Sequence, residues 1–457
     1  MDAFILEEFG GAQLGDERLD RRLRHVACDL ARDPGKSIPG AAGSSAAAKA
    51  AYRFFSHGSV TRERVMQPHV ESTIRRVLEE PVVLVVEDTT TLSYSHHPAA
   101  EGMGKIGARQ GLDRMQGVLV HSALAVTVGR HEALGILDQE VIVRKGYQPP
   151  QESRRSRIKR PRESGKWMSC ARRVLDRLKD PSRAIFVFDR EGDVFEVLEG
   201  IQDLGGRFVI RASWNRLVRT ADGKSGYALD EVRREAVMAR MEVRLAPGGG
   251  RRERIARVCV RAGRYEVLPP RIQPGGRRSR RVHLVHVKEE DPPPGVEGLE
   301  WFLLTGEPID TPEEAMRVVE HYRGRWKIEE WHKALKTGCR MEDRQLETWD
   351  RLEVLLGILS VMAWRLLALR DAAKRGARAP DPLTETQRLI LRKMDPGLGK
   401  KSCAQDYLVA IAKLGGFLAR KSDGNPGWIT LWRGWTRLRD VEVGFALNQP
   451  SGDVGNG

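Results

Sequence analysis

Two short, uninterrupted apolar runs, each followed by an aspartate, constrain the fold of this chain more than any other feature. They read VVLVVED at 82–88 and AIFVFD at 184–189, and a third run, RFVIR, follows at 207–211. Strands in which nearly every residue is apolar are typical of sheets covered by helices on both faces. The sequence therefore predicts an α/β fold, with Asp88 and Asp189 at the C-terminal ends of their strands, where side chains emerge into a cleft.

Asp88 and Asp189 would then place two carboxylates at one edge of the sheet. Carboxylates held close together repel each other unless a cation lies between them, and oxygen ligands favour Mg²⁺ or Mn²⁺ over softer metals. The alternative is that each aspartate caps the helix after its strand, which is the commoner role of one aspartate considered alone.

A long helix is predicted to begin after Thr311 in TPEEAMRVVEHYRGRWKIEEWHKALKTG. Thr311 suits the N-cap, Pro312 the first helical position, and Glu314 completes a capping box. Within an arc of about 60°, one stripe of this helix carries a carboxylate among cationic and aromatic side chains. Its members are Tyr322, Arg325, Glu329 and Lys336. A solvated charged face is the alternative, and it is the commoner one for a helix of this kind.

Two adjacent glutamates, Glu329 and Glu330, compete for the acidic position on this stripe. With Tyr322 as the origin, Glu329 lies about 20° away and Glu330 about 80° away on the other side. Only Glu329 is centred on the stripe, so helix geometry favours it as a ligand.

The character of the sequence changes along the chain and predicts three domains. Residues 1–70 show helical spacing, residues 212–300 contain alternating basic and apolar runs between glycine and proline clusters, and the chain is helical again after Thr311. Alternating runs separated by glycine and proline clusters predict antiparallel β structure. The expected division is a helical domain at 1–70, a catalytic domain at 71–345 with a β insertion at about 212–300, and a helical region at 346–457.

The charge of the chain favours a polyanionic partner. Lys and Arg total 77 against 62 Asp and Glu, a formal charge of +15. The five cysteines are scattered and predict neither a disulfide framework nor a zinc site. No signal peptide is recognised, and the longest uncharged apolar stretch, 354–364, is shorter than the roughly 20 residues that span a bilayer. We therefore expect a cytoplasmic protein without a membrane partner.

Several motifs, in a fixed order, resemble those of one family. The spacing Tyr322-x2-Arg325-x3-Glu329-x6-Lys336 resembles the YREK signature of bacterial insertion-sequence DDE transposases that form DNA hairpins. EDTTTLSY around Asp88 and DREGDV around Asp189 are similar to the first and second acidic motifs of that family. LGDERLDRRL, GSSAAAKAAYRFF, ESGKW, WFLLTGEP and LGGFLARKSDG also match in the family's order, so the resemblance covers nearly the whole chain.

The resemblance implies a ribonuclease-H-like catalytic core, interrupted by the antiparallel β insertion and flanked by N- and C-terminal helical domains. Asp189 and Glu329 are 140 residues apart, more than one strand and one helix require, and the 212–300 block accounts for the excess. The family's organisation also implies that residues 1–70 bind DNA and that residues 346–457 carry dimer contacts.

The resemblance further implies a cut-and-paste reaction, in which Asp88, Asp189 and Glu329 are catalytic and hold two metal ions. The enzyme nicks a transposon end, the freed 3′-hydroxyl forms a hairpin on the opposite strand, and the hairpin is reopened before insertion. The implied cofactor is Mg²⁺, with Mn²⁺ able to substitute. The implied partners are double-stranded DNA, as terminal inverted repeats and as target, and a second copy of the chain in a synaptic complex at the bacterial nucleoid.

The same match assigns DNA contacts to residues outside the carboxylate set. By motif, Tyr322, Arg325 and Lys336 contact phosphates near the cleaved end. Lys333, on the helix stripe, and Arg211, which ends RFVIR, are further candidates, and so is the basic run at 154–162; surface charge is the alternative for all three. Trp301 would stack on a base flipped out of the duplex, and its alternative is packing between the insertion and the core.

Two other functions share these features. A metal-dependent DNA nuclease with the same core would cleave without joining strands. A non-catalytic DNA-binding relative, such as a transposition repressor, is disfavoured because the three carboxylates and the N-terminal motifs LGDERLDRRL and AAYRFF are all present.

A chain of charge +15 should bind end DNA with a strong dependence on salt, because each neutralised phosphate releases counterions. We expect the logarithm of the association constant to fall linearly with the logarithm of the salt concentration, with a slope of about −0.9 for each phosphate contact. Gel shifts over a salt series measure this slope. A slope near zero would remove DNA binding as the reason for the charge.

Overall fold

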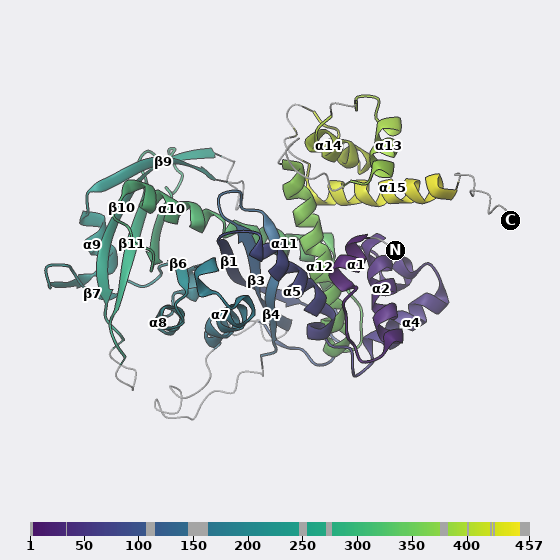
Figure 1. The fold of residues 1–457 in the computed structure, drawn as a ribbon, viewed down its shortest axis with the longest axis horizontal. Helices are drawn as coiled ribbons and strands as arrows, with labels where there is room; N and C mark the ends of the chain where they lie inside the picture. The colour runs from purple at the N-terminus through teal and green to yellow at the C-terminus, as the bar shows by residue number, and fades with distance from the viewer. Residues whose placement is uncertain are drawn as a thin grey trace. The chain divides into compact units, whose positions relative to one another are not determined.

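The computed structural model describes residues 3–32, 34–106, 115–144, 163–245, 254–270, 277–374, 383–399, 402–420, 423 and 426–447. The chain divides into two compact units (Figure 1). Unit 1 comprises Met1–Ser72, Leu92–Val118 and Glu330–Gly457, and unit 2 comprises Thr73–Thr91 and Leu119–Glu329. The N- and C-terminal helices therefore belong to one unit, and the sequence between them supplies most of the other.

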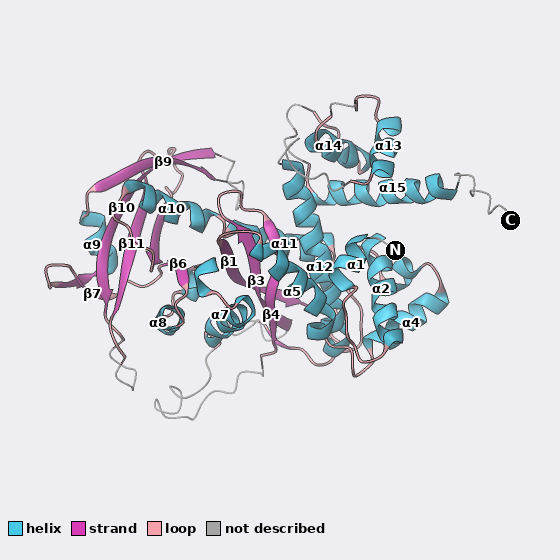
Figure 2. Cartoon of the chain, viewed as in Figure 1, coloured by secondary structure: helices cyan, strands magenta, loops and turns pink. Residues whose placement is uncertain are grey.

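Three parallel strands form the centre of the sheet. They are β1 (Val83–Ser93), β5 (Ala184–Phe188) and β6 (Arg207–Arg211), in the order β1-β5-β6. All five residues of β5 are buried, as the apolar run predicts. Helices α7 (Gly165–Leu178) and α8 (Phe195–Asp203) pack on these strands through a shared apolar core (Figure 2). The mixed α/β architecture is confirmed.

Antiparallel strands extend the sheet on both sides of this centre. On the β1 side lie β3 (Gln116–Thr127) and β4 (Ala133–Ile142), which pair with each other, and the short β2 (Gly104–Lys105) beside β3. On the β6 side, β12 (Glu300–Thr305) pairs antiparallel with β6.

The 212–300 region contains β structure, as its alternating runs between glycine and proline clusters predict. Its described elements are β7 (Leu217–Arg219), β8 (Ser225–Tyr227), α9 (Ala228–Arg234), β9 (Val237–Leu245), β10 (Arg254–Val267) and β11 (Arg280–Glu289). The strands of this region pair antiparallel with one another in the described part of the chain, and β11 pairs with β12. The region therefore continues the central sheet through β12.

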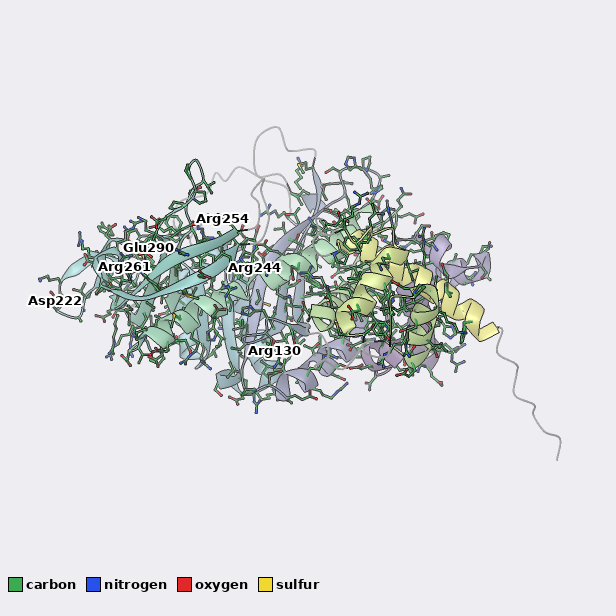
Figure 3. All side chains as sticks on the ribbon, turned by 90° about the horizontal axis from the view of Figure 1, so that it is seen from above. Arg130, Asp222, Arg244, Arg254, Arg261 and Glu290 are labelled. Carbon is green, nitrogen blue, oxygen red and sulfur yellow. The ribbon has the colours of Figure 1, made fainter. Side chains whose placement is uncertain are left out.

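Much of the basic charge of these strands is offset by nearby glutamates. Arg254 forms an ion pair with Glu289, and Arg240 Nε lies 3.1 Å from Glu290 Oε1. Figure 3 labels Arg244, Arg254 and Glu290 on this part of the sheet. These ion pairs give strands β9 to β11 a mixed surface rather than a uniformly basic one.

The helix predicted after Thr311 begins as expected but does not continue as one straight helix. The capping box of Thr311 and Glu314 is present, and α10 spans Pro312–Arg323. At Gly324 the backbone tightens, because Arg325 N donates to Tyr322 O at 3.0 Å and Ile328 N to Arg325 O at 3.3 Å. Such contacts from residue i to i−3 interrupt the α-helical pattern.

Helix α11 (Trp326–Lys333) follows this break, and a π-helical segment (Ala334–Gly338) follows α11. Angles computed for a continuous helix therefore do not hold from Tyr322 to Lys336, and the prediction of one straight stripe is wrong. Glycine has low helix propensity, which explains a break at Gly324. The α-carbon of Gly324 also packs closely, since a Cβ there would lie 2.5 Å from Leu84 Cδ1.

Unit 1 is built from helices from both ends of the chain. The N-terminal set is α1 (Ala3–Phe9), α2 (Glu17–Arg32), α3 (Ile38–Ala42), α4 (Ser45–Phe55) and α5 (Arg62–Leu78), whose last turns belong to unit 2. The C-terminal set is α12 (Trp349–Lys374), α13 (Glu385–Met394), α14 (Ala404–Leu414) and α15 (Trp428–Leu447).

Contacts between α12 and the N-terminal helices hold these two sets together. The ring of Trp364 stacks on Phe4 at 6.4 Å and lies 4.9 Å from His69. His69 Nδ1 in turn lies 2.5 Å from Glu8 Oε2, and both side chains are buried.

Helix α12 is long and apolar enough to cross a membrane, by length and composition. The most apolar 18-residue window within Trp349–Asp371 has a mean hydropathy of 1.9, and 72% of that window is buried inside the protein. The sequence analysis counted only the uncharged residues 354–364, whereas the apolar helix continues past the charged Glu353 and Arg365. Core helices of soluble proteins share these properties, so α12 is weak evidence for a membrane.

Helices α14 and α15 cross closely at Gly434, so the packing there can be tested by substitution. A Cβ at Gly434 would lie 1.7 Å from Ile411 O. Because this neighbour is backbone, the helices must separate to admit a methyl group, so Gly434→Ala should destabilise the protein by about 1–3 kcal/mol. Thermal unfolding followed by circular dichroism measures the change.

Gly444 of the same helix is the matched control. A Cβ at Gly444 would meet no heavy atom within 4 Å, so Gly444→Ala should be neutral or stabilising by about 0.5–1 kcal/mol through helix propensity. Equal effects of the two substitutions would contradict the close crossing.

Candidate active site

The register of the parallel strands brings Asp88 and Asp189 to the same level of the sheet. Val83 pairs with Ala184 and Val86 with Val187, a constant offset of 101 residues, and the two aspartates are separated by the same 101 residues. On neighbouring parallel strands, residues in register lie about 4.8 Å apart. Strand pairing alone therefore predicts that the two carboxylates are neighbours.

Arg211 follows the same rule on the next strand. Ile185 pairs with Arg207 and Phe188 with Ile210, an offset of 22 residues, which is also the separation of Asp189 and Arg211. Asp88, Asp189 and Arg211 thus lie in one row across β1, β5 and β6. The row places a cation beside the two acids.

Asp88 lies within its strand rather than at its end, which corrects the sequence prediction. Strand β1 continues to Ser93, since the threonines after Asp88 are β-branched and favour extended backbone. Asp88 Oδ1 accepts a hydrogen bond from Thr89 N at 2.7 Å. Burial, together with the charges of Asp189 and Glu329, raises the pKa of Asp88 to about 7, although Thr89 N–H and Arg325 oppose this shift.

Asp189 directly follows β5 and caps a short 3₁₀ turn, Arg190–Gly192. Its Oδ1 accepts a hydrogen bond from Glu191 N at 2.8 Å. The capping role weighed as an alternative is therefore present. It does not exclude metal binding, because an ionised carboxylate has two oxygens with several acceptor sites.

Glu329 reaches this row through Arg325. Arg325 Nη2 donates to Glu329 Oε1 at 2.5 Å, and Arg325 Nη1 lies 3.9 Å from Asp88 Oδ2. The side chain of Arg325 is 7% exposed and that of Glu329 is 41% exposed. Glu330 instead forms an ion pair with Arg370. Of the two adjacent glutamates, Glu329 shares a cation with Asp88.

The aromatic candidates are buried beside this group. Trp301 is 4% exposed, and its ring meets that of Tyr322 edge-on at 5.1 Å. Burial raises the pKa of Tyr322, while Arg325 and Arg211 oppose the shift. In this structure Trp301 is packed in the interior, as its alternative role predicts. To stack on a base, the Trp301 ring would have to move away from Tyr322.

Lys333 and Lys336 belong to unit 1, whereas the other seven site candidates belong to unit 2. Lys333 is exposed, and Lys336 Nζ lies 3.5 Å from Glu342 Oε1. The basic run at 154–162 lies outside the described residues.

The donor set of the three acids fits a hard divalent cation. Asp88, Asp189 and Glu329 supply only oxygen atoms, the ligands that Mg²⁺ and Mn²⁺ prefer. The raised pKa of Asp88 supports this match between the acids and a cation. It arises from burial and from the negative charges of Asp189 and Glu329, and a bound cation would offset both effects by favouring the ionised carboxylate.

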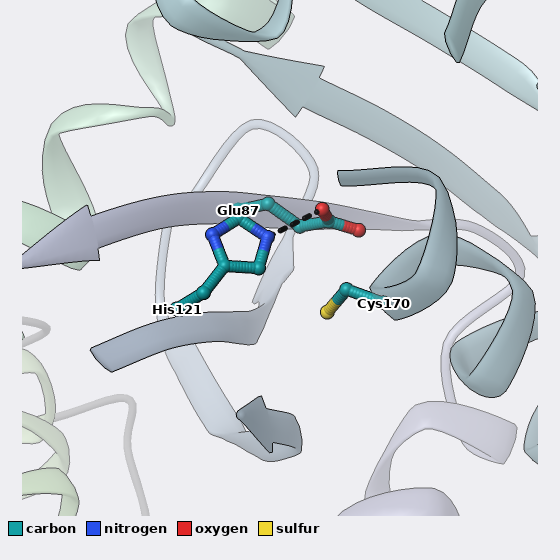
Figure 4. Close-up of side chains that lie close together, drawn as sticks. All are labelled: Glu87, His121 and Cys170. Atoms are coloured by element: carbon teal, nitrogen blue, oxygen red, sulfur yellow. Dashed lines mark hydrogen bonds and ion pairs between the residues drawn. The ribbon is translucent and has the colours of Figure 1, made fainter. Parts of the chain in front are cut away.

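A second group beneath Asp88 was not found from the sequence. Glu87, His121 and Cys170 are fully buried, and their ligand atoms lie within 4.8 Å of one another (Figure 4). Burial raises the pKa values of Glu87 and Cys170 well above their usual range. Only the position of Glu87 beside Asp88 was a signal, since neither His121 nor Cys170 belongs to a motif with metal-ligand spacing.

Asp193 is the second aspartate of the DREGDV motif, and its contacts give it a structural role. It is 3% exposed, its Oδ2 accepts hydrogen bonds from Ser213 N at 2.7 Å and Trp214 N at 3.0 Å, and its Oδ1 lies 2.5 Å from Arg216 Nη1. It ties the loop after β5 to the chain leaving β6, and so helps to hold Asp189 in place.

The raised pKa of Asp88 predicts that Asp88→Asn is more stable than the wild type when a chelator removes divalent metal, and that the difference depends on pH. The folded pKa of about 7 exceeds the ordinary value of 3.8, so the wild type loses stability as pH rises between these values. The amide removes this loss, and its advantage should be larger at pH 8 than at pH 5 by roughly 2–3 kcal/mol. Thermal unfolding at both values checks this. Exposed Asp291→Asn is the control, and an Asp88→Asn gain that is equal at both pH values would contradict the assignment.

Two family models match the chain. The one described as transposase DNA-binding matches residues 1–60, and the one described as transposase DDE domain matches residues 168–366. The second match includes Asp189 and Glu329, while Asp88 enters the site through its register with Asp189. The chain therefore combines the two sequence modules of a DDE transposase, a DNA-binding segment and a DDE domain.

Proposed function

We propose that the protein is a cut-and-paste transposase of the hairpin-forming, YREK-signature type, with a ribonuclease-H-like core interrupted by the β insertion. It nicks transposon ends, forms and resolves a hairpin, and inserts the element into target DNA. The observation that carries the proposal is the row of Asp88 and Asp189 in register, joined to Glu329 through Arg325. The two family matches support the same function.

Asp88, Asp189 and Glu329 are the residues that would hold the Mg²⁺ ions, with Mn²⁺ as a substitute. Bound there, the metal would supply Lewis-acid stabilisation of the negative charge that develops on the phosphate and would lower the pKa of a bound water, so that a nucleophile forms at neutral pH. The side chains contribute position: Asp88 is fixed by Thr89 N–H, and Asp189 by Glu191 N–H.

The cations of the site would contact the DNA backbone. Arg325 is preorganised by two carboxylates, and a planar guanidinium suits bidentate phosphate binding. Arg211 lies in the row of the acids, and Tyr322 lies beside it. Lys336 is proposed to bind a phosphate near the cleaved end, as Tyr322 and Arg325 are, and Lys333 is a further candidate for that role. Trp301 is proposed to stack on a flipped base.

The proposed partner is double-stranded DNA, both the terminal inverted repeats and the target. Residues 1–70 would recognise the ends, residues 71–345 would catalyse, and residues 346–457 would carry the contacts of a homodimer in the synaptic complex. The proposed location is the bacterial cytoplasm, at the nucleoid.

The function is tested with the full chain, Mg²⁺ and a duplex bearing the inverted repeat that brackets its reading frame. Glu329→Gln should abolish cleavage while retaining end binding, because a neutral amide removes charge needed to stabilise the transition state. Glu330→Gln, the matched control, should leave substantial cleavage. Denaturing gels measure nicking, and gel shifts measure binding.

The products separate the competing functions. A transposase yields nicked, hairpin and joined products in sequence, whereas a nuclease yields nicks without joining. Loss of cleavage in Glu330→Gln with retention in Glu329→Gln would overturn the assignment of Glu329. Binding without any cleavage by the wild type would instead favour a repressor.

A further inference from the structure

His121 of β3 bridges the two residues that flank Asp88. Its Nε2 lies 3.1 Å from Glu87 Oε2, and its Nδ1 lies 2.9 Å from Thr89 Oγ1. Figure 4 shows the imidazole beside the Glu87 carboxylate. Glu87 and His121 are both 0% exposed, so water does not compete for these bonds. In the tautomer protonated at Nε2, the ring donates to the Glu87 carboxylate and accepts at Nδ1 from the Thr89 hydroxyl, so both contacts form together.

The bridge lies on the opposite face of β1 from Asp88. Side chains alternate along a strand, so Glu87 and Thr89 share one face and Asp88 projects from the other. Fixing residues 87 and 89 leaves the backbone between them little freedom to rotate. Thr89 N also donates to Asp88 Oδ1, so the peptide anchored by the Thr89 side chain is the one that orients the carboxylate.

Aromatic packing fixes the His121 ring and extends to the second aspartate. Trp167 of α7 meets His121 edge-on at 4.7 Å, and its indole lies 5.1 Å from Phe188. Phe188 is the last residue of β5 and directly precedes Asp189. One buried column, His121, Trp167 and Phe188, therefore underlies both aspartates.

We propose that His121 is a positioning residue, which sets the direction of the Asp88 carboxylate through Thr89 and so tunes the affinity of the site for divalent metal. This inference rests on the proposed function, because it takes Asp88 as a metal ligand. Residues that orient metal ligands typically change metal affinity by roughly 10–100-fold when removed.

The group could instead be a ligand set for a softer metal, since Glu87, His121 and Cys170 offer oxygen, nitrogen and sulfur. The hydrogen bonds favour the bridge, because they engage both ring nitrogens of His121 and one oxygen of Glu87 without a metal. Zinc analysis of the purified full chain separates the two. We expect no stoichiometric zinc, and one zinc per chain that is lost in Cys170→Ser but kept in Cys259→Ser would overturn the proposal.

The central experiment measures Mn²⁺ binding to the full chain by electron paramagnetic resonance, without DNA. His121→Phe keeps a ring but removes both hydrogen bonds, and Thr89→Val removes only the hydroxyl. Each should weaken Mn²⁺ binding by roughly tenfold or more. His121→Asn, whose amide can replace Nδ1 at Thr89, should stay within a few-fold of the wild type. Thr91→Val, two residues along the same strand, is the control and should bind Mn²⁺ as the wild type does.

A purely structural role would lower the unfolding temperature without this pattern of metal affinities. Unchanged Mn²⁺ affinity in folded Thr89→Val overturns the proposal, and so does an equal loss in His121→Asn and His121→Phe. Thr89→Val covers the case in which His121→Phe does not fold. If wild-type protein cleaves DNA but the variants bind Mn²⁺ normally, only this inference fails. If wild-type protein neither binds Mn²⁺ nor cleaves, the proposed function itself fails.

Discussion

The pairing of β1 with β5 is the interaction on which the site depends. Its backbone hydrogen bonds hold Val83 to Val86 against Ala184 to Val187, and the constant offset carries Asp88 to the level of Asp189. A slip of one residue would turn one aspartate to the other face of the sheet. The fully buried β5 makes such a slip expensive, because every apolar side chain of the strand would lose its packing.

This arrangement creates an electrostatic problem that the surrounding residues partly solve. Like charges lie close together in a region shielded from water, which disfavours ionisation of Asp88. Arg325 compensates with one guanidinium shared between Asp88 and Glu329, and Arg211 adds a second cation in the same row. The acids and the arginines of the site therefore form one electrostatically coupled group, in which the two cations offset part of the negative charge.

Sequence reasoning worked where a local pattern decides the structure. The apolar runs predicted β1, β5 and β6, and Thr311 and Glu314 predicted the start of α10. It failed where a local signal was outweighed in the prediction, as with the single glycine at Gly324 and the threonines that continue β1 beyond Asp88. It also did not anticipate the π-helical segment at Lys336. The bridge at His121 was invisible because it joins two strands that are distant in sequence. His121 lies on β3, and both of its partners, Glu87 and Thr89, lie on β1.

The route of the chain through the sheet also bears on how the protein is made. Asp88 and Asp189 are synthesised before β12 pairs with β6 and before α10 and α11 deliver Glu329. Domains emerge from the ribosome from the N-terminus onward, so a nascent chain that ends before Glu329 carries two acids of the three. Under the proposed function, a chain that stops before Glu329 lacks one of the three acids and should not cut DNA, so the full set of acids is present only after 329 of the 457 residues have been synthesised.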